Sequence, residues 1–130
     1  MKQLPLVILL VLSSAPVSAE WVLISVLDQA GVTIDVESDT IHHNENRVTM
    51  SELIDYRTTQ TVAGTSYLSA SLQREYDCVG NVHRTLTLTE LSGNMGTGTV
   101  RFVNSDTHKW QPVDPGSIAK RLWKFACGKK

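Results

Sequence analysis

The sequence lacks the features that mark nucleic-acid-binding and membrane-embedded proteins. It contains 12 Lys and Arg against 13 Asp and Glu, so it has no basic excess with which to release the counterions of a nucleic acid. Its longest apolar run, residues 4–12, is about half of the roughly 20 residues that a helix needs to cross a bilayer. We therefore expect no nucleic-acid partner, and a mature protein that is not embedded in a membrane.

Enzymatic machinery is also missing from the sequence. No Gly-x-Ser-x-Gly elbow is present to favour a hydrolase triad. Residues 95–99 resemble the start of a glycine-rich phosphate loop, but no Gly-Lys-Ser/Thr follows them. The sequence has two cysteines, and if both form a bridge no thiol nucleophile remains. We expect no catalytic residues, no enzymatic activity and no cofactor.

The amino-terminal residues have the layout of a secretory signal peptide. Lys2 precedes the apolar run, and small residues ending at Ala19 follow it, which predicts a signal peptide over 1–19 and cleavage after Ala19. No cysteine follows the run, which disfavours a lipid anchor. The remaining residues, 20–130, are too few for two ordinary domains. We expect one exported domain, in the periplasm or on the outer cell surface.

Alternation of apolar and polar residues predicts an antiparallel sheet of about six strands. The expected strands are 21–27, 32–36, 47–59, 66–78, 84–91 and 99–104. The polar stretch 37–46 has no clear period and is expected to form a loop or a single helical turn. In the two longest runs the even-numbered positions are mainly apolar and the odd-numbered ones mainly polar, so the sheet should be half-buried.

The register of the central hairpin predicts an ion pair within the apolar face. A turn centred on residues 62–64 places Val48 opposite Cys78, Met50 opposite Tyr76 and Ile54 opposite Leu72. The same register sets Glu52 opposite Arg74, where the two charges would neutralise each other. The alternative is that both side chains lie near a sheet edge and extend to water.

One helix is expected, at the carboxyl end of the chain. Ser117 is a suitable amino-terminal cap and Gly128 a suitable terminator. The apolar residues between them cover one broad arc at 100° per residue, so this helix should pack on the apolar face of the hairpin. Cys78 lies at a strand end on that face and Cys127 in the last helical turn, which predicts a disulfide between them. The fold class is therefore α+β, with the helix tied to the sheet.

Two surfaces are candidates for binding. The odd-numbered face of the hairpin offers a site for a protein partner, and its residues are Leu53, Asp55, Arg57, Tyr67, Ser69 and Gln73. The alternative is a haem or metal carrier that uses His42, His43, His83 or His108. Their spacing matches no strand or helix ligand pair, because adjacent strand residues face opposite ways, so our prediction is that there is no metal site.

An ordered set of short motifs along the chain resembles the surface-adhesin protein E family. These motifs are Trp21, Asp55-Tyr56, Thr59-Gln60, Ser66-Tyr67-Leu68-Ser69, Glu75-Tyr76-Asp77-Cys78, the strand that begins at Arg84, Met95-Gly96-Thr97-Gly98, Trp110-x-Pro112, Pro115-Gly116-Ser117 and Cys127. The resemblance implies a Gram-negative source and a six-stranded antiparallel sheet with a carboxy-terminal helix held by a Cys78–Cys127 disulfide. It also implies an adhesin-like module that binds envelope or host matrix proteins and can form a homodimer, with haem binding known in the family.

The chain departs from the family pattern at two places. Thr33 and Ile34 stand where family members tend to have an aromatic pair, and Ser51 stands where they often have a tryptophan. Fewer aromatic residues mean fewer anchors for a partner, so the surface that would bind a host protein is not evident from the motifs.

Overall fold

The computed structural model describes residues 21–27 and 31–129, and the expected signal peptide lies outside this part of the chain. The strands are β1 (Trp21–Leu27), β2 (Val32–Asn44), β3 (Arg47–Val62), β4 (Thr65–Asp77), β5 (Val82–Leu91), β6 (Val100–Asn104) and β7 (Gln111–Pro112). A 3₁₀ helix, η1 (Asn94–Gly96), and an α-helix, α1 (Ile118–Cys127), complete the described elements. The predicted α+β class is confirmed.

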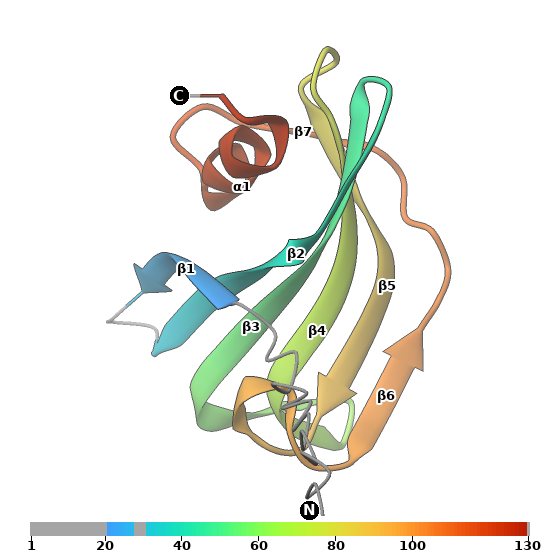
Figure 1. The fold of residues 1–130 in the computed structure, drawn as a ribbon. Helices are drawn as coiled ribbons and strands as arrows, with labels where there is room; N and C mark the ends of the chain where they lie inside the picture. Colours follow the sequence, from blue (N-terminus) through green and yellow to red (C-terminus); the bar gives the residue numbers. More distant parts are fainter. Residues whose placement is uncertain (1–20, 28–30, 130) are drawn as a thin grey trace, which may run out of the picture.

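The strands β1 to β6 form one antiparallel sheet in the order of the chain (Figure 1). The short strand β7 pairs with the first two residues of β5, Val82 and His83. Each pair of neighbours is joined by a short connection, and the β3–β4 turn consists of Ala63 and Gly64. Both residues have positive φ, 49° and 80°, as expected for the type I′ turn that matches strand twist. This tight turn closes the longest hairpin of the molecule.

The predicted register of that hairpin is wrong by two residues. Val48 lies opposite Tyr76, Met50 opposite Arg74 and Glu52 opposite Leu72. The cause is an irregularity in β3 between Asp55 and Gln60, which places extra residues on one strand. Because a shift of two preserves the alternation of side chains, the predicted division into an apolar and a polar face still holds.

The loop predicted over 37–46 is also wrong, because β2 continues to Asn44. The register shifts between Glu37 and His42, and a side chain closes the resulting break in the ladder. The Oγ1 atom of Thr40 donates to the Glu37 carbonyl over 2.6 Å and accepts from the Ser51 amide over 2.9 Å. The bulge hides the period of two that a regular strand would show in the sequence.

The helix α1 covers the even-numbered face, which we call the helix face. Ser117 Oγ accepts from the Lys120 amide, and Gly128 ends the helix in the left-handed conformation, as expected. The core lies between α1 and the sheet, and its most buried residues are Val36, Val48, Met50, Tyr76, Leu122, Trp123 and Ala126. The apolar arc of the helix therefore packs where the sequence predicted.

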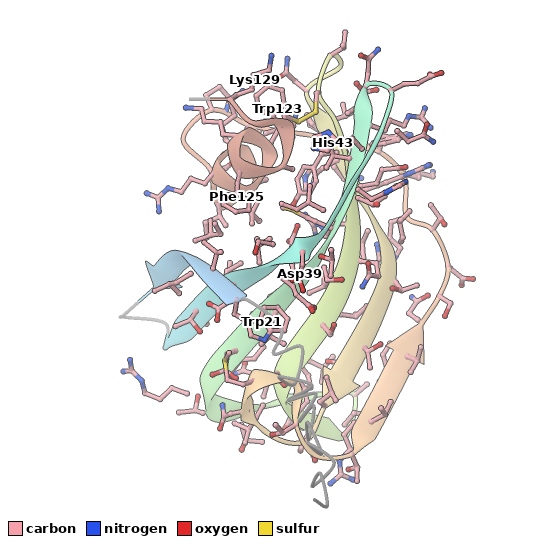
Figure 2. The ribbon with its side chains drawn as sticks, in the orientation of Figure 1. Trp21, Asp39, His43, Trp123, Phe125 and Lys129 are labelled. Carbon is pink, nitrogen blue, oxygen red and sulfur yellow. A yellow bond between two sulfur atoms is a disulfide. The ribbon has the colours of Figure 1, made fainter. Side chains whose placement is uncertain are left out.

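The predicted disulfide between Cys78 and Cys127 is confirmed. The two Cα atoms lie 5.6 Å apart and the bond closes a separation of 49 residues. It is drawn in yellow beside Trp123 in Figure 2, whose indole Nε1 donates to the Asp77 carbonyl over 2.9 Å. The bond and this hydrogen bond hold the end of α1 against the end of β4.

Candidate functional site

The opposite, polar face of the sheet is partly covered by the loop that contains η1. Ser69 Oγ donates to the Gly93 carbonyl over 2.7 Å and accepts from the Gly96 amide over 3.0 Å. Asp55 Oδ1 accepts from the Met95 amide over 2.7 Å and from the side-chain amide of Asn94 over 3.1 Å. These contacts fasten the loop to β3 and β4.

Two of the six residues predicted to bind a partner are therefore not available to one. Leu53 is 1% exposed and Ser69 is fully buried, which corrects the expectation that both present themselves on the polar face. Sequence alternation assigned them to the right face, but it gave no sign that η1 folds back over that face. Asp55 is occupied by the loop. Arg57, Tyr67 and Gln73 retain exposed surface.

A hollow of about 350 Å³ lies on the polar face next to η1. Its floor includes Ser51 and Gln73, whose side chains are hydrogen-bonded to each other over 2.6 Å, and its rim includes Trp21 and Met95. Figure 2 shows Trp21 over the lower part of the sheet, well away from α1. Two members of the predicted set, Gln73 and the buried Leu53, thus line this hollow.

The clearest exposed apolar feature is the outer strand β6. Val100, Phe102 and Val103 are 57%, 43% and 53% exposed, and we call these three residues the edge patch. Within the described residues, β6 pairs only with β5, so its other side carries unpaired backbone groups. A row of unpaired N–H and C=O groups at a sheet edge is a template for pairing with another chain, and clustered exposed apolar side chains mark interaction surfaces.

A pair of tyrosines lies near the edge patch. The rings of Tyr56 and Tyr67 meet edge to face with centroids 5.6 Å apart. Burial and the neighbouring Tyr56 and Glu90 raise the pKa of Tyr67 to about 12, so its hydroxyl stays protonated at physiological pH. Glu90 lies on β5 and is the register partner of Phe102, so β5 alone separates Tyr67 of β4 from β6. Tyr67 belongs to the predicted set, whereas Tyr56 was missed.

A polar cluster on the helix face contains the buried Glu52 and Tyr76 and the half-buried Arg74 and His83. The Tyr76 hydroxyl donates to Glu52 Oε2, and Arg74 Nε lies 3.9 Å from Glu52 Oε1, within ion-pair range but beyond hydrogen-bond length. The two charges thus share a face, as predicted, although they are diagonal neighbours and not directly opposite. Burial raises the pKa of Glu52 to about 7, against the opposing effects of Arg74 and Tyr76.

The four histidines of the haem or metal carrier hypothesis make separate contacts. His42 and His43 lie near the end of β2, and the amide of His108 donates to the Thr85 carbonyl. His83 Nδ1 lies 2.5 Å from Arg74, and burial and that guanidinium lower the pKa of His83. Among residues 21–27 and 31–129, no three metal-ligating side chains gather in one place. No observation on the described residues favours a haem or metal carrier over a protein-binding module that uses the edge patch.

The described part of the chain has no helix with the length and hydropathy needed to cross a bilayer.

Comparisons with known proteins point to one family. The family model described as Surface-adhesin protein E matches residues 21–128, and no curated protein matches the sequence. Crystal form II of Haemophilus influenzae protein E has a similar fold, with a TM-score of 0.64 and 11% identity over 82% of this chain and 87% of that chain. Protein E from non-typeable Haemophilus influenzae gives a TM-score of 0.60 and 10% identity, over 82% and 75%. At such identity the structural likeness shows the fold alone.

Proposed function

Because the chain belongs to the surface-adhesin protein E family, we propose that it is an exported, non-catalytic binding module that engages a partner protein through the β6 edge. The observation that carries this proposal is the edge patch, three large apolar side chains on a strand whose outer side is unpaired within the described part of the chain. An extended segment of a partner would pair with the β6 backbone and place its own side chains on both faces of the sheet.

The side chains around β6 are suited to this mode of binding. Phe102 lies opposite Glu90 and Val103 opposite Thr89, so the patch presents apolar surface on both faces of the sheet. The tyrosine pair adds aromatic surface with polar hydroxyls, the kind of anchor that contributes most at protein interfaces. Main-chain pairing supplies affinity and these side chains supply selectivity.

Export is supported by the predicted signal peptide and by the disulfide, since such bonds persist in oxidising compartments. The partners that fit an exported family member are envelope proteins or host matrix proteins. The protein recovered from the periplasmic or surface fraction should begin at Glu20. Mass spectrometry of that protein, with cell fractionation, tests the processing and decides between the two locations.

A capture experiment tests the binding edge. The processed wild-type protein is immobilised and exposed to envelope extract and to purified extracellular matrix proteins, and bound proteins are identified by mass spectrometry. Val100→Lys/Val103→Lys should lose the captured partner, because two charges would be set into an apolar interface. The matched control is Leu23→Lys/Val79→Lys, which alters two exposed apolar residues, one in β1 at the opposite edge of the sheet and one between β4 and β5, and should capture normally.

Two results would count against the proposal: capture of nothing by the wild type, or equal capture by both double variants. A second copy of the chain is the competing occupant of β6, and sedimentation velocity detects it. If the wild type forms a dimer, Val100→Lys/Val103→Lys is a monomer and no other protein is captured, then the β6 edge binds a second copy of the chain and not a partner protein.

A further inference from the structure

The hollow next to η1 on the polar face has an aromatic side chain beside a row of polar ones. Its first row runs directly across β1 to β4 and consists of Trp21, Glu37, Ser51 and Gln73. Residues that lie opposite each other on neighbouring strands point to the same face of a sheet. All four side chains therefore project from the polar face, and all four line the hollow.

A second row of side chains and the η1 loop complete the hollow. Leu53, Ser71 and Thr89 are register partners on β3, β4 and β5, and they line the hollow together with Leu91, Met95 and Gly96. Its volume, about 350 Å³, falls within the range of about 300–1,000 Å³ that is typical of small-molecule sites. Apolar and polar groups thus share one small concave surface.

Several polar groups that line the hollow are not engaged by the protein itself. Gln73 Nε2 donates to Ser51 Oγ over 2.6 Å. No hydrogen bond or ion pair between described residues engages the side chains of Glu37, Ser71 and Thr89, which also line the hollow. These three side chains offer two hydroxyls, which both donate and accept, and a carboxylate, which accepts. A ligand in the hollow therefore meets groups that can bond to hydroxyls of either polarity.

A pyranose sugar has the two kinds of surface that this hollow complements. The axial C–H groups of the sugar form an apolar face that packs on an indole ring through dispersion, and its equatorial hydroxyls surround the ring edge. Glu37 is the one charged residue among the described residues that line the hollow. Its carboxylate would accept a charge-assisted hydrogen bond from a hydroxyl and would repel an anionic ligand, so a neutral sugar is the better match.

We infer that the hollow binds one neutral hexopyranose unit of a glycan. The apolar face of the sugar ring packs on Trp21, and its hydroxyls bond to Glu37, Ser71 and Gln73. The site is built from β1 to β5 and η1 and does not use the edge patch. It is therefore independent of the function proposed for the β6 edge.

Nuclear magnetic resonance of the ¹⁵N-labelled processed protein tests this inference with methyl β-D-glucopyranoside as the probe. Saturable shifts at millimolar concentration, as expected for a ligand of this size, should appear at the indole of Trp21 and the side-chain amide of Gln73. The indoles of Trp110 and Trp123, which do not line the hollow, should not move. The three tryptophans of the chain thus give a positive signal and two internal controls in one spectrum.

Two further probes each keep half of the proposed recognition. D-glucitol has the hydroxyls without a ring to pack on Trp21, and tetrahydropyran-2-methanol has a ring without the ring hydroxyls. Each should bind about tenfold more weakly than the glucoside, or worse, because it loses one of the two sets of contacts. This comparison uses the wild-type protein alone, so it is independent of the folding of any variant.

A pair of tryptophan variants locates the site. Trp21→Ala should abolish the saturable shift of the Gln73 amide, whereas Trp110→Ala removes an indole that stacks with Arg84 outside the hollow and should leave binding unchanged.

The inference fails if the glucoside gives no saturable shift, if D-glucitol binds equally well, or if folded Trp21→Ala binds as the wild type does. It also fails if tetramethylammonium shifts the same resonances at lower concentration than the glucoside. Trp21 and Glu37 would then form a site for a cation.

Discussion

The two ends of the sheet differ in how far other elements cover them. At one end α1 covers the sheet, and the Cys78–Cys127 bond and the Trp123 hydrogen bond hold it in place. At the other end β6 pairs with β5 alone among residues 21–27 and 31–129 and presents the edge patch (Figure 1). The same antiparallel ladder thus supports a closed core and an open edge.

This contrast separates the residues that hold the fold from those that are free to bind. The core around Met50, Tyr76 and Trp123 is buried, and substitution there costs stability through cavities and lost contacts. The edge patch is already in water, so its substitution should change binding and leave stability nearly unaltered.

The largest effect on the closed end should come from removing the disulfide. For a separation of 49 residues, the loop-entropy model predicts that Cys78→Ala/Cys127→Ala lowers the free energy of unfolding by about 4 kcal/mol. Urea denaturation of the oxidised wild type and of the variant measures the difference. Reducing agent should lower the stability of the wild type to that of the variant. A difference below about 1 kcal/mol between the oxidised wild type and the variant would show that the bond does not hold the helix.

The next effect should be a pH dependence that originates at Glu52. Its pKa rises from 4.5 to about 7 on folding, so the folded protein binds the proton more tightly than the unfolded chain. Stability from this group is therefore full below pH 4.5 and is lost as the pH rises to 7, by about 3 kcal/mol. Glu52→Gln keeps an acceptor for Tyr76 and should remove this loss.

Urea denaturation from pH 4.5 to 8 measures this loss of stability as the difference in the free energy of unfolding between the wild type and Glu52→Gln. His83 lies in the same cluster, and its lowered pKa gives the opposite slope below pH 6.5, which the difference largely cancels. Asp106→Asn, in an exposed loop, should keep the wild-type profile. Parallel profiles for wild type and Glu52→Gln would contradict the assignment to Glu52.

A smaller effect is expected where η1 is fastened to the polar face. Ser69→Ala removes the two hydrogen bonds to Gly93 and Gly96, at about 1 kcal/mol each. The variant should unfold at lower urea, and amides of the 93–97 loop should exchange faster with solvent. Ser66→Ala, whose hydroxyl contact with Thr61 is exposed, is the control and should be nearly neutral. Equal stabilities for both variants would mean that the loop is not held through Ser69.

The smallest effect on stability should come from the edge patch itself. Val103→Lys changes an exposed side chain, so the free energy of unfolding should move by no more than about 0.5 kcal/mol. Val62→Lys, at the end of the β3–β4 hairpin, should behave alike in denaturation. A loss of more than 1 kcal/mol for Val103→Lys alone would show that β6 contributes to the core and is not free to pair.

Much of the fold follows from local patterns in the sequence. The alternation in β3 and β4 predicted which residues face α1, and the Ser117 cap and Gly128 terminator bounded the helix as the structure has it. The pairing of Cys78 with Cys127 followed from their places at a strand end and a helix end. Such features depend on residues close in sequence or on one shared face.

The wrong predictions have physical causes that do not show in local sequence patterns. The bulges in β2 and β3 shift the ladder through side-chain and tertiary contacts, so the loop at 37–46 and the hairpin register were wrong. The burial of Leu53 and Ser69 depends on a loop distant in sequence. The β6 edge was missed because alternation cannot tell an outer strand from an inner one; Val100, Phe102 and Val103 with a glycine-rich stretch before them were the only signal.

Hydrogen–deuterium exchange of the protein with and without its captured partner tests the central assignment most directly. In the free protein the amides of β3 and β4 should exchange slowly and the outward amides of β6 rapidly. Addition of the partner should protect 100–104 and leave α1 unchanged. Protection that falls on α1 or on the polar face, with 100–104 unaffected, would contradict the account.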